Sequence, residues 1–293
     1  MQVEEAMRSA VRHAIRMLLL LVLGSLLGAA LVRMAPGFGV HEEDLDSRLS
    51  RESHAALDQK PAEDASLIRF YIHYCGRLLR GDLGTSTSLH EPVRQLLAER
   101  IPETTKTLAI GMALAWTLGL GAAFASLLPR WHWIQWSTSF ICSLILSIPT
   151  AVLAIFFFLA QAPVRIAVGL VVLPSVYSFA RGLLNRTSGL PHVLAARARG
   201  VGELGILIRH VGRVAAPQLL ALCGVSVCTA LAACVPIEAL CDSPGIGQLA
   251  WQAALSRDLP LLVTLTLIVT LVTLCANLAA EAVGGAAFRE VRR

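Results

Sequence analysis

Charged residues are scarce in this sequence of 293 residues. They make up 15% of the chain, against roughly 25% in soluble domains, while hydrophobic residues make up 55%. The hydrophobic residues are also grouped in blocks of about twenty, the length that a helix needs to cross a bilayer. This distribution excludes a soluble globular protein and predicts a chain that crosses a membrane several times.

Several sequence motifs of enzymes are missing as well. There is no GxxxxGK[S/T] phosphate-binding loop, so we do not expect this chain to bind ATP in the P-loop manner. The HExxH and GxSxG motifs and the CxxC pair are absent too. We therefore expect no catalytic residue, no metal site and no cofactor on this chain. An intramembrane enzyme that uses Cys or His stays open as an alternative.

The seven cysteines mostly fall inside apolar stretches. In such places cysteine usually acts as a small buried hydrophobic residue. Cys75 and Cys241 fall in segments that we expect outside the cytoplasm, where a disulfide between them is chemically allowed.

Six apolar stretches predict an all-α membrane protein with six transmembrane helices. The predicted spans are Met17–Val32, Thr107–Leu128, Ser137–Ala160, Ile166–Ala180, Gln218–Val235 and Leu261–Ala280. Pro149 is expected to kink the third span, and Pro174 to break the fourth. In the second span Gly111, Ala115 and Gly119 recur every four residues, which predicts the close approach of another helix.

Basic residues are distributed unevenly around these spans. The segments that we expect in the cytoplasm hold thirteen arginines and lysines, whereas the two short outer turns hold only Arg165 and Arg257. Because an excess of Lys and Arg marks cytoplasmic loops, both termini are predicted inside. The expected division is an amphipathic lead-in with the first helix (1–34), an extracytoplasmic segment (35–105) and a permease-like core of five helices (106–293).

The segment 35–105 is polar, with twelve acidic residues and eight arginines or lysines. We expect it to contain short helices, one over Ser66–Leu79 and one over Pro92–Arg100. A long polar excursion of this kind crosses the membrane largely regardless of its charge.

The loop 181–217 is the longest polar interruption in the second half of the chain. It contains one acid, Glu203, and six arginines: Arg181, Arg186, Arg197, Arg199, Arg209 and Arg213. Its centre, Ala195 to Gly200, predicts a short helix that ends at the glycines 200 and 202. We interpret the loop as a cytoplasmic docking surface for a soluble partner. An ordinary positive-inside loop without a partner stays open.

Four groups of residues, in this order along the chain, resemble one family. They are GDLGTS (81–86) with ERIPETTKTLAIG (99–111); ARARG (196–200) followed by Arg209-His210 and Arg213; Glu238 with Pro244-Gly245-x-Gly247; and Arg257-Asp258-x-Pro260 with Asn277-Leu278. This pattern is similar to permease subunits of the peptide-type (oligopeptide, dipeptide, nickel) ABC importers, which are binding-protein-dependent inner membrane components. The resemblance covers almost the whole chain.

The resemblance implies a type I importer permease in a bacterial cytoplasmic membrane. Its implied partners are a second permease, which makes a heterodimer, two ATPase subunits that hold the ATP and Mg²⁺, and an extracytoplasmic solute-binding protein. The implied substrates are peptides or similar small solutes. The ATPase-coupling residues would be Ala195, Ala196, Arg197, Ala198, Arg199, Gly200, Val201, Gly202 and Glu203. The outer hairpin or gate would contain Glu238, Pro244, Gly245, Gly247, Arg257 and Asp258.

The sequence also departs from the family pattern. The outer segment between the third and fourth spans shrinks to a few residues around Pro163, and Arg186 stands where an acid is expected. A transport-inactive membrane scaffold, or a divergent subunit that binds partners through the loop 181–217, is therefore the alternative.

Overall fold

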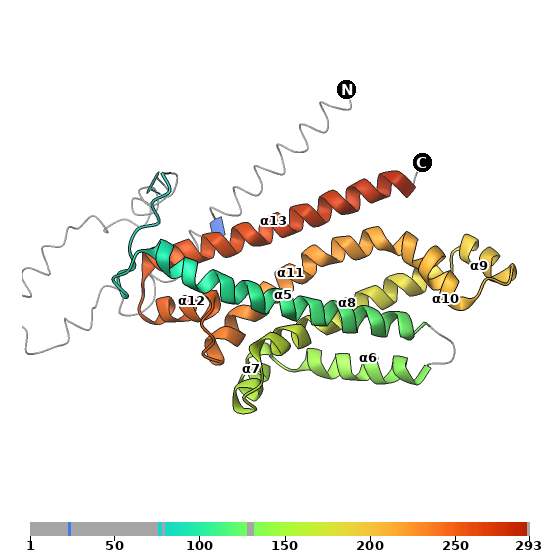
Figure 1. Cartoon of the computed structure of the whole chain (residues 1–293), viewed down its shortest axis with the longest axis horizontal. Helices are drawn as coiled ribbons and strands as arrows, with labels where there is room; N and C mark the ends of the chain where they lie inside the picture. Colours follow the sequence, from blue (N-terminus) through green and yellow to red (C-terminus); the bar gives the residue numbers. More distant parts are fainter. Residues whose placement is uncertain (1–22, 25–75, 78–79, 128–131, 292–293) are drawn as a thin grey trace, which may run out of the picture. The chain divides into compact units, whose positions relative to one another are not determined.

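The computed structural model describes residues 23–24, 76–77, 80–127 and 132–291 (Figure 1). Regular structure in these residues is helical, apart from an isolated bridge between Thr85 and Pro92. The helices are α5 (Val93–Ala125), α6 (His132–Ser147), α7 (Thr150–Leu159), α8 (Val164–Ser188), α9 (Pro191–Ala198), α10 (Glu203–Gly205), η3 (Ile206–Gly212), α11 (Arg213–Leu240), α12 (Ile246–Leu255) and α13 (Leu259–Val291). The predicted all-α class is confirmed.

Four helical runs are long and apolar enough to cross a membrane, among the residues that the structure describes. They are Val93–Ala125, Val164–Ser188, Glu203–Leu240 and Leu259–Ala280. A fifth crossing is present if the bent pair of α6 and α7 forms one span. These five correspond in order to the second to sixth predicted spans. The first predicted span, Met17–Val32, lies outside the described residues except for Leu23 and Gly24, so the count of six stays a prediction.

Helix α5 joins two elements that the sequence separates. We predicted a short helix over Pro92–Arg100 and a span that starts at Thr107, but α5 runs without interruption through Pro102. A proline inside a helix removes one backbone hydrogen bond. Leu97 before it and Thr104 after it are both buried, so packing on either side of Pro102 outweighs that loss.

Pro149 and Pro174, which were expected to disturb the third and fourth spans, behave differently from each other. Pro174 was expected to break the fourth span, yet it is buried within α8, which continues to Ser188. The buried neighbours Val172 and Val176 hold the helix on both sides of it. Pro149 was expected to kink the third span, and it does more: it precedes the first residue of α7, where the helix axis turns by 98°.

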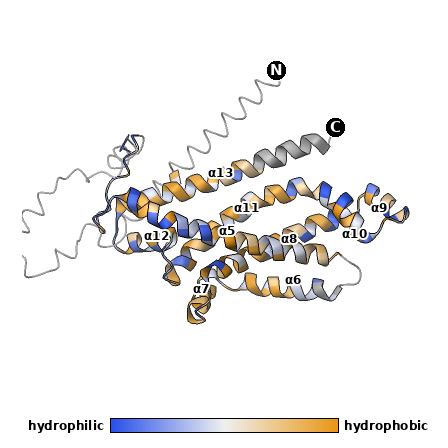
Figure 2. Ribbon diagram, viewed as in Figure 1, coloured by the Kyte–Doolittle hydropathy of each residue, from blue (hydrophilic) through white to orange (hydrophobic). Residues whose placement is uncertain are grey.

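The chain divides into two compact units, which are described separately. One contains residues 1–99 and 250–271, and the other contains residues 100–249 and 272–293. In the second unit α8 packs against α6, α7 and α11. A buried apolar cluster joins α7, α8 and α11 with α5: Ala115, Leu153, Ala154, Phe157, Ala167, Val168, Val172, Val176, Leu222, Ala230, Ala233, Cys234 and Ile237. Figure 2 shows the hydrophobic residues along these helices.

The small-residue stripe of α5 meets α8 at very short range, as predicted. A Cβ atom on Gly111 would lie 3.1 Å from the backbone nitrogen of Gly169, and one on Gly119 would lie 3.1 Å from a methyl carbon of Val176. Ala115, between the two glycines, is fully buried. The missing side chains therefore let the two backbones touch, as small residues do between membrane helices.

Candidate functional site

The basic loop connects α8 to α11 through three short elements. Helix α9 starts at Pro191, whose fixed φ suits the first position of a helix, and it ends at Ala198. Gly200 then adopts φ +80°, a left-handed conformation that favours glycine. The predicted helix over Ala195 to Gly200 is therefore only partly right: it begins four residues earlier and ends two residues sooner, because Pro191 sets its start.

One face of α9 is fixed to the membrane helices. Val193 and Ala196 are buried, and α9 packs against α8 and η3. Val193 belongs to a buried cluster with Ala123, Cys142, Tyr177, Ala180, Leu184, Ile206, Val211 and Ala215. In Figure 1, α9 and α10 lie together where α8 ends and α11 begins. Helix α9 therefore lies against α8 directly and is joined to α11 through η3.

The charged residues of the loop are partly engaged with each other. The Arg197 guanidinium lies 3.1 Å from the Glu203 carboxylate, and both side chains are partly exposed. Arg199 donates from Nε to the carbonyl oxygen of Ala195 at 3.3 Å. The Arg197–Glu203 pair connects α9 with the start of α10 across the turn between them.

The loop also exposes large apolar side chains, which sequence reasoning missed. Those exposed by more than a third of their surface are Leu190, Leu194, Val201, Leu204 and Ile208. Their signal in the sequence was apolar residues placed between arginines in a polar loop. Exposed apolar surface with a polar rim is typical of protein interaction sites. Figure 2 shows the mixed character of this region, in contrast to the membrane helices.

The connection back into α11 is a π-helix, η3. It places Arg209 and His210 in its last turn, while Ile206, Leu207 and Val211 are buried. Wider π-type turns are uncommon and frequently occur at functional sites. The loop is therefore joined to its following span through a non-standard helical segment.

At the other end of α11 a hairpin, residues 241–249, surrounds the carboxylate of Glu238. This side chain is 1% exposed. Its Oε2 accepts hydrogen bonds from the hydroxyl of Thr104 (3.1 Å) and the backbone amide of Gly247 (2.7 Å). Its Oε1 accepts one from the thiol of Cys234 at 3.1 Å. The predicted hairpin residues Glu238 and Gly247 are thus in direct contact.

The two glycines of the hairpin are required by this contact. A Cβ atom on Gly245 would lie 2.2 Å from the carboxylate of Glu238, and one on Gly247 would lie 2.6 Å from the Cα of Val235. No side chain fits at either place. Pro244, which precedes them, is exposed. The Pro-Gly-x-Gly string is therefore the part of the chain that closes over a buried acid.

A second series of hydrogen bonds links α5 to the same hairpin. Arg100 donates from Nη1 to the side-chain oxygen of Gln248 at 2.7 Å, and Gln248 donates in turn to Asp242. Neither Arg100 nor Gln248 was singled out from the sequence, because partners 148 residues apart leave no local pattern.

The other two predicted hairpin residues, Arg257 and Asp258, belong to the other unit. Asp258 is fully buried there. Its carboxylate accepts hydrogen bonds from the hydroxyls of Ser86 and Ser88, from the Ser88 amide and from the Leu261 amide. Asp258 thus ties the segment after Gly84 to the start of α13, a link that the sequence did not reveal.

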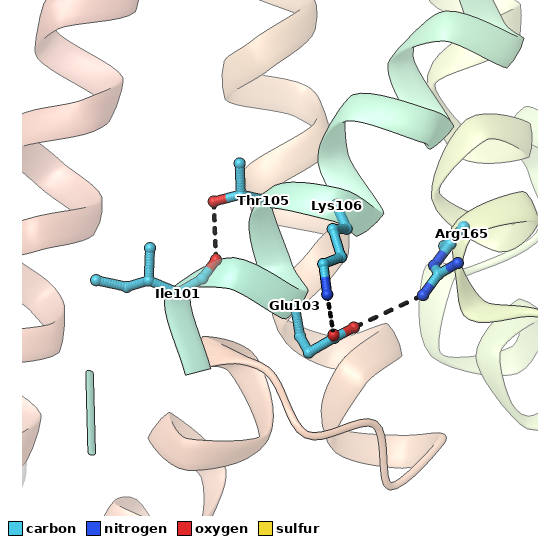
Figure 3. A network of polar contacts seen from close by, with 5 residues as sticks. All are labelled: Ile101, Glu103, Thr105, Lys106 and Arg165. Carbon is cyan, nitrogen blue, oxygen red and sulfur yellow. Dashed lines mark hydrogen bonds and ion pairs between the residues drawn. The ribbon is translucent and has the colours of Figure 1, made fainter. Parts of the chain in front are cut away.

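Glu103 forms a further charged group near the start of α8. Its carboxylate lies 2.7 Å from Lys106 on the same helix and 3.6 Å from Arg165 on α8 (Figure 3). These side chains are partly exposed, and one acid serves two cations. Thr105, on the same helix, donates to the carbonyl oxygen of Ile101, so its hydroxyl stays within α5.

Cys241 is a free thiol in this structure, so the disulfide that we considered with Cys75 is not formed. Its Sγ lies 3.4 Å from the carbonyl oxygen of Ala154, and burial raises the pKa of the thiol. Cys75 lies outside the described residues. Within those residues no group of three or more His, Cys, Asp or Glu side chains is arranged to hold a metal ion.

Known proteins resemble the chain over most of its length. The family described as binding-protein-dependent transport system inner membrane component matches residues 115–293. A protein of Brucella suis biovar 1 (strain 1330) named as a peptide permease is 26% identical over 239 residues, which cover 71% of this chain and 74% of the relative. The nickel import system permease protein NikB of Staphylococcus aureus (strain USA300) is 26% identical over 283 residues, 87% of this chain and 83% of the relative.

Proposed function

The chain belongs to the family of binding-protein-dependent transport system inner membrane components, as a permease subunit of the peptide-type ABC importers, and on this premise we propose how it works. It is a multi-pass membrane protein. Its loop 181–217 follows the ATP-driven movements of a separate ATPase and passes them to the spans. The chain acts as a moving wall of the pathway and not as an enzyme.

The observation that carries this proposal is the attachment of α9. Helix α9 packs against α8 and η3 with Val193 and Ala196 buried, while Leu194 on the same short helix is half exposed. A partner that grips Leu194 therefore moves two spans at once. The residues 195–203, with the Arg197–Glu203 pair and the left-handed Gly200, form the turn that a partner would meet.

The proposed transport cycle is a population shift between two arrangements of the spans. Closure of the ATPase subunits on ATP brings the coupling loops of two permeases together, which favours an outward-open cavity. Hydrolysis and release return the inward-open arrangement. The chain itself holds no cofactor in this cycle, because ATP and Mg²⁺ are bound by the ATPase subunits.

The remaining partners and the solute follow from the family. We assign the chain to a heterodimer with a second permease, served by two ATPase subunits and an extracytoplasmic solute-binding protein. Relatives named for peptide and for nickel import support peptides or similar small solutes as the substrate class. Both termini and the loop 181–217 are assigned to the cytoplasm, and the segment 35–105 and the hairpin 241–249 to the outer side.

The test uses the complete complex in liposomes, with the ATPase subunits and the binding protein. Leu194→Glu places a charge on the exposed face of α9, and it is expected to weaken ATPase binding by about 2 kcal/mol, the scale of one buried leucine, and to stop uptake. Leu89→Glu makes the same change at another exposed leucine and is expected to leave both intact.

Three results would count against the proposal. Equal ATPase binding by both variants would show that α9 is not the coupling contact. Normal ATPase binding by the unaltered chain without uptake would favour the scaffold alternative. Loss of uptake in a variant that keeps Cys234, lacks the other cysteines and is poor in histidine would favour the intramembrane enzyme.

A further inference from the structure

The carboxylate of Glu238 is buried at a place where three separate segments meet. Glu238 belongs to α11, Thr104 to α5, and Gly247 to the start of α12. The donors that reach it are neutral: a hydroxyl, an amide and a thiol. A buried acid with this many hydrogen bonds is expensive to disturb, because each donor that leaves exposes an unpaired group.

Thr104 takes part in this cluster twice. Its hydroxyl donates to Glu238 and accepts a hydrogen bond from the backbone amide of Ile246 at 2.8 Å. One side chain therefore holds α5 both to the end of α11 and to the hairpin 241–249. Thr104 is 4% exposed, so water does not compete for its hydroxyl in this arrangement.

A second link lies one helical turn away on α5. Arg100 and Thr104 are four residues apart and share one face of the helix. Arg100 reaches Gln248, and Gln248 reaches Asp242 at the start of the hairpin. Two attachment points one turn apart oppose both rotation and sliding of α5 against the hairpin. The hairpin is closely packed against α11, because Gly245 and Gly247 bring its backbone directly onto the side chain of Glu238.

We propose that Glu238 is a positioning residue whose carboxylate clamps the segment of α5 after Arg100 to the hairpin 241–249, so that both move as one rigid body when the transporter changes state. The inference rests on the proposed function, since it concerns the transport cycle. Glu238 is then not a contact for the solute in the pathway. A pathway group needs free hydrogen-bonding capacity and access, whereas Glu238 is enclosed and already has three donors.

The first test compares two neighbouring threonines. Thr104→Val removes the hydroxyl of the clamp and keeps the shape of the side chain. Thr105→Val is the matched control, because the Thr105 hydroxyl is exposed and bonds only within its own helix. In liposomes with the complete complex, uptake is expected to fall about tenfold or more in Thr104→Val relative to Thr105→Val, the scale of an unpaired buried acceptor. Glu238→Gln keeps one acceptor oxygen and is expected to lie between them.

The second test reads the rigid body directly. Spin labels on unnatural amino acids at Ile101 and Pro244, which are both exposed, leave the native cysteines in place. The distance between the labels is expected to be narrow and unchanged between the nucleotide-free and the vanadate-trapped complex. Thr104→Val is expected to broaden it, and Thr105→Val is not.

A change of this distance between the two states in the unaltered complex would overturn the clamp, as would equal distributions and equal uptake in the two threonine variants. If Thr104→Val does not accumulate in the membrane, Gln248→Leu breaks the second link and is judged by the same criteria. Failure of the proposed function looks different. The unaltered complex would then take up no solute, while the nucleotide-free distances of the two variants would still decide whether the clamp exists.

Discussion

Gly111 of α5 and Gly169 of α8 cross backbone to backbone. A Cβ atom built on Gly169 would lie 2.9 Å from the carbonyl oxygen of Gly111 and 3.4 Å from its Cα. Real Cβ atoms essentially never approach another atom to 2.9 Å, so Gly169 excludes a side chain in this arrangement, and a Cβ on Gly111 would be tight, at 3.1 Å from the backbone nitrogen of Gly169. The spacing of α5 and α8 in the membrane is therefore set by the absence of two methyl groups.

Gly169→Ala is expected to destabilise the protein by about 1 to 3 kcal/mol, the cost of an extra methyl group in a packed contact. Gly182→Ala is the control on the same helix, because a Cβ there meets nothing within 4 Å. It is expected to stabilise α8 by about 0.5 to 1 kcal/mol, since glycine is a poor helix former. Thermal unfolding in detergent measures both; a similar shift in the two variants would contradict the crossing.

Gly200→Val is expected to weaken the loop through the backbone alone. Gly200 has φ +80° and no atom near its Cβ position, so the substitution meets no steric obstacle but forces a branched residue into a left-handed conformation. The cost is about 1 to 2 kcal/mol. Gly200→Asn, which tolerates this conformation, is expected to lose less. The affinity of each variant for the ATPase provides the measurement. Weaker binding by Gly200→Asn than by Gly200→Val would contradict this prediction.

Asp258→Asn is expected to destabilise the unit that holds it by about 1 to 3 kcal/mol. The carboxylate of Asp258 accepts hydrogen bonds on both oxygens, so the amide of Asn would place its NH2 donor against one of these donors. Asp82→Asn is the control: Asp82 is exposed and accepts from the Gly84 amide at 2.9 Å, which an Asn oxygen also does. It should change the stability by less than about 0.5 kcal/mol. Denaturation monitored by a label on α12 would show the difference.

Removing the ion pair of the coupling loop is expected to cost little stability. Arg197 and Glu203 are both partly exposed, and pairs of this kind contribute about 0 to 1 kcal/mol. Arg197→Ala should therefore unfold within a few degrees of the unaltered protein, and the difference should shrink in about 1 M salt, which screens the pair. A large loss of stability would mean that Arg197 holds the loop fold itself.

Much of the fold was predictable because the membrane imposes simple length and polarity rules. The all-α class, the order of five apolar runs and the close-packing stripe at Gly111 and Gly119 followed from spacing alone. The prolines were not predictable in this way. Pro102 and Pro174 sit inside intact helices, whereas Pro149 marks a sharp bend, and what distinguishes them is the packing of distant helices.

The residues of the candidate site were likewise only partly predictable from the sequence. Glu238, Gly245 and Gly247 were singled out as one group, and the structure brings them together. Thr104 was not singled out, because its partner Glu238 is 134 residues away. The exposed Leu194 was likewise missed, since a hydrophobic residue in a polar loop is usually buried, and only the fold decides which leucines are.

The bend between α6 and α7 has an electrical consequence. Helix α6 has 16 residues, which span about 24 Å, less than the roughly 30 Å of the hydrocarbon layer. If α6 stands along the membrane normal, the turn of 98° means that α7 adds almost no depth, and α8 would then begin within the hydrocarbon layer. Arg165 would then carry its charge in a poorly hydrated layer, with Glu103 as counter-ion in place of solvent. The pairing of Arg165 with Glu103, more than the length of α6, would then set the depth of this bend in the membrane.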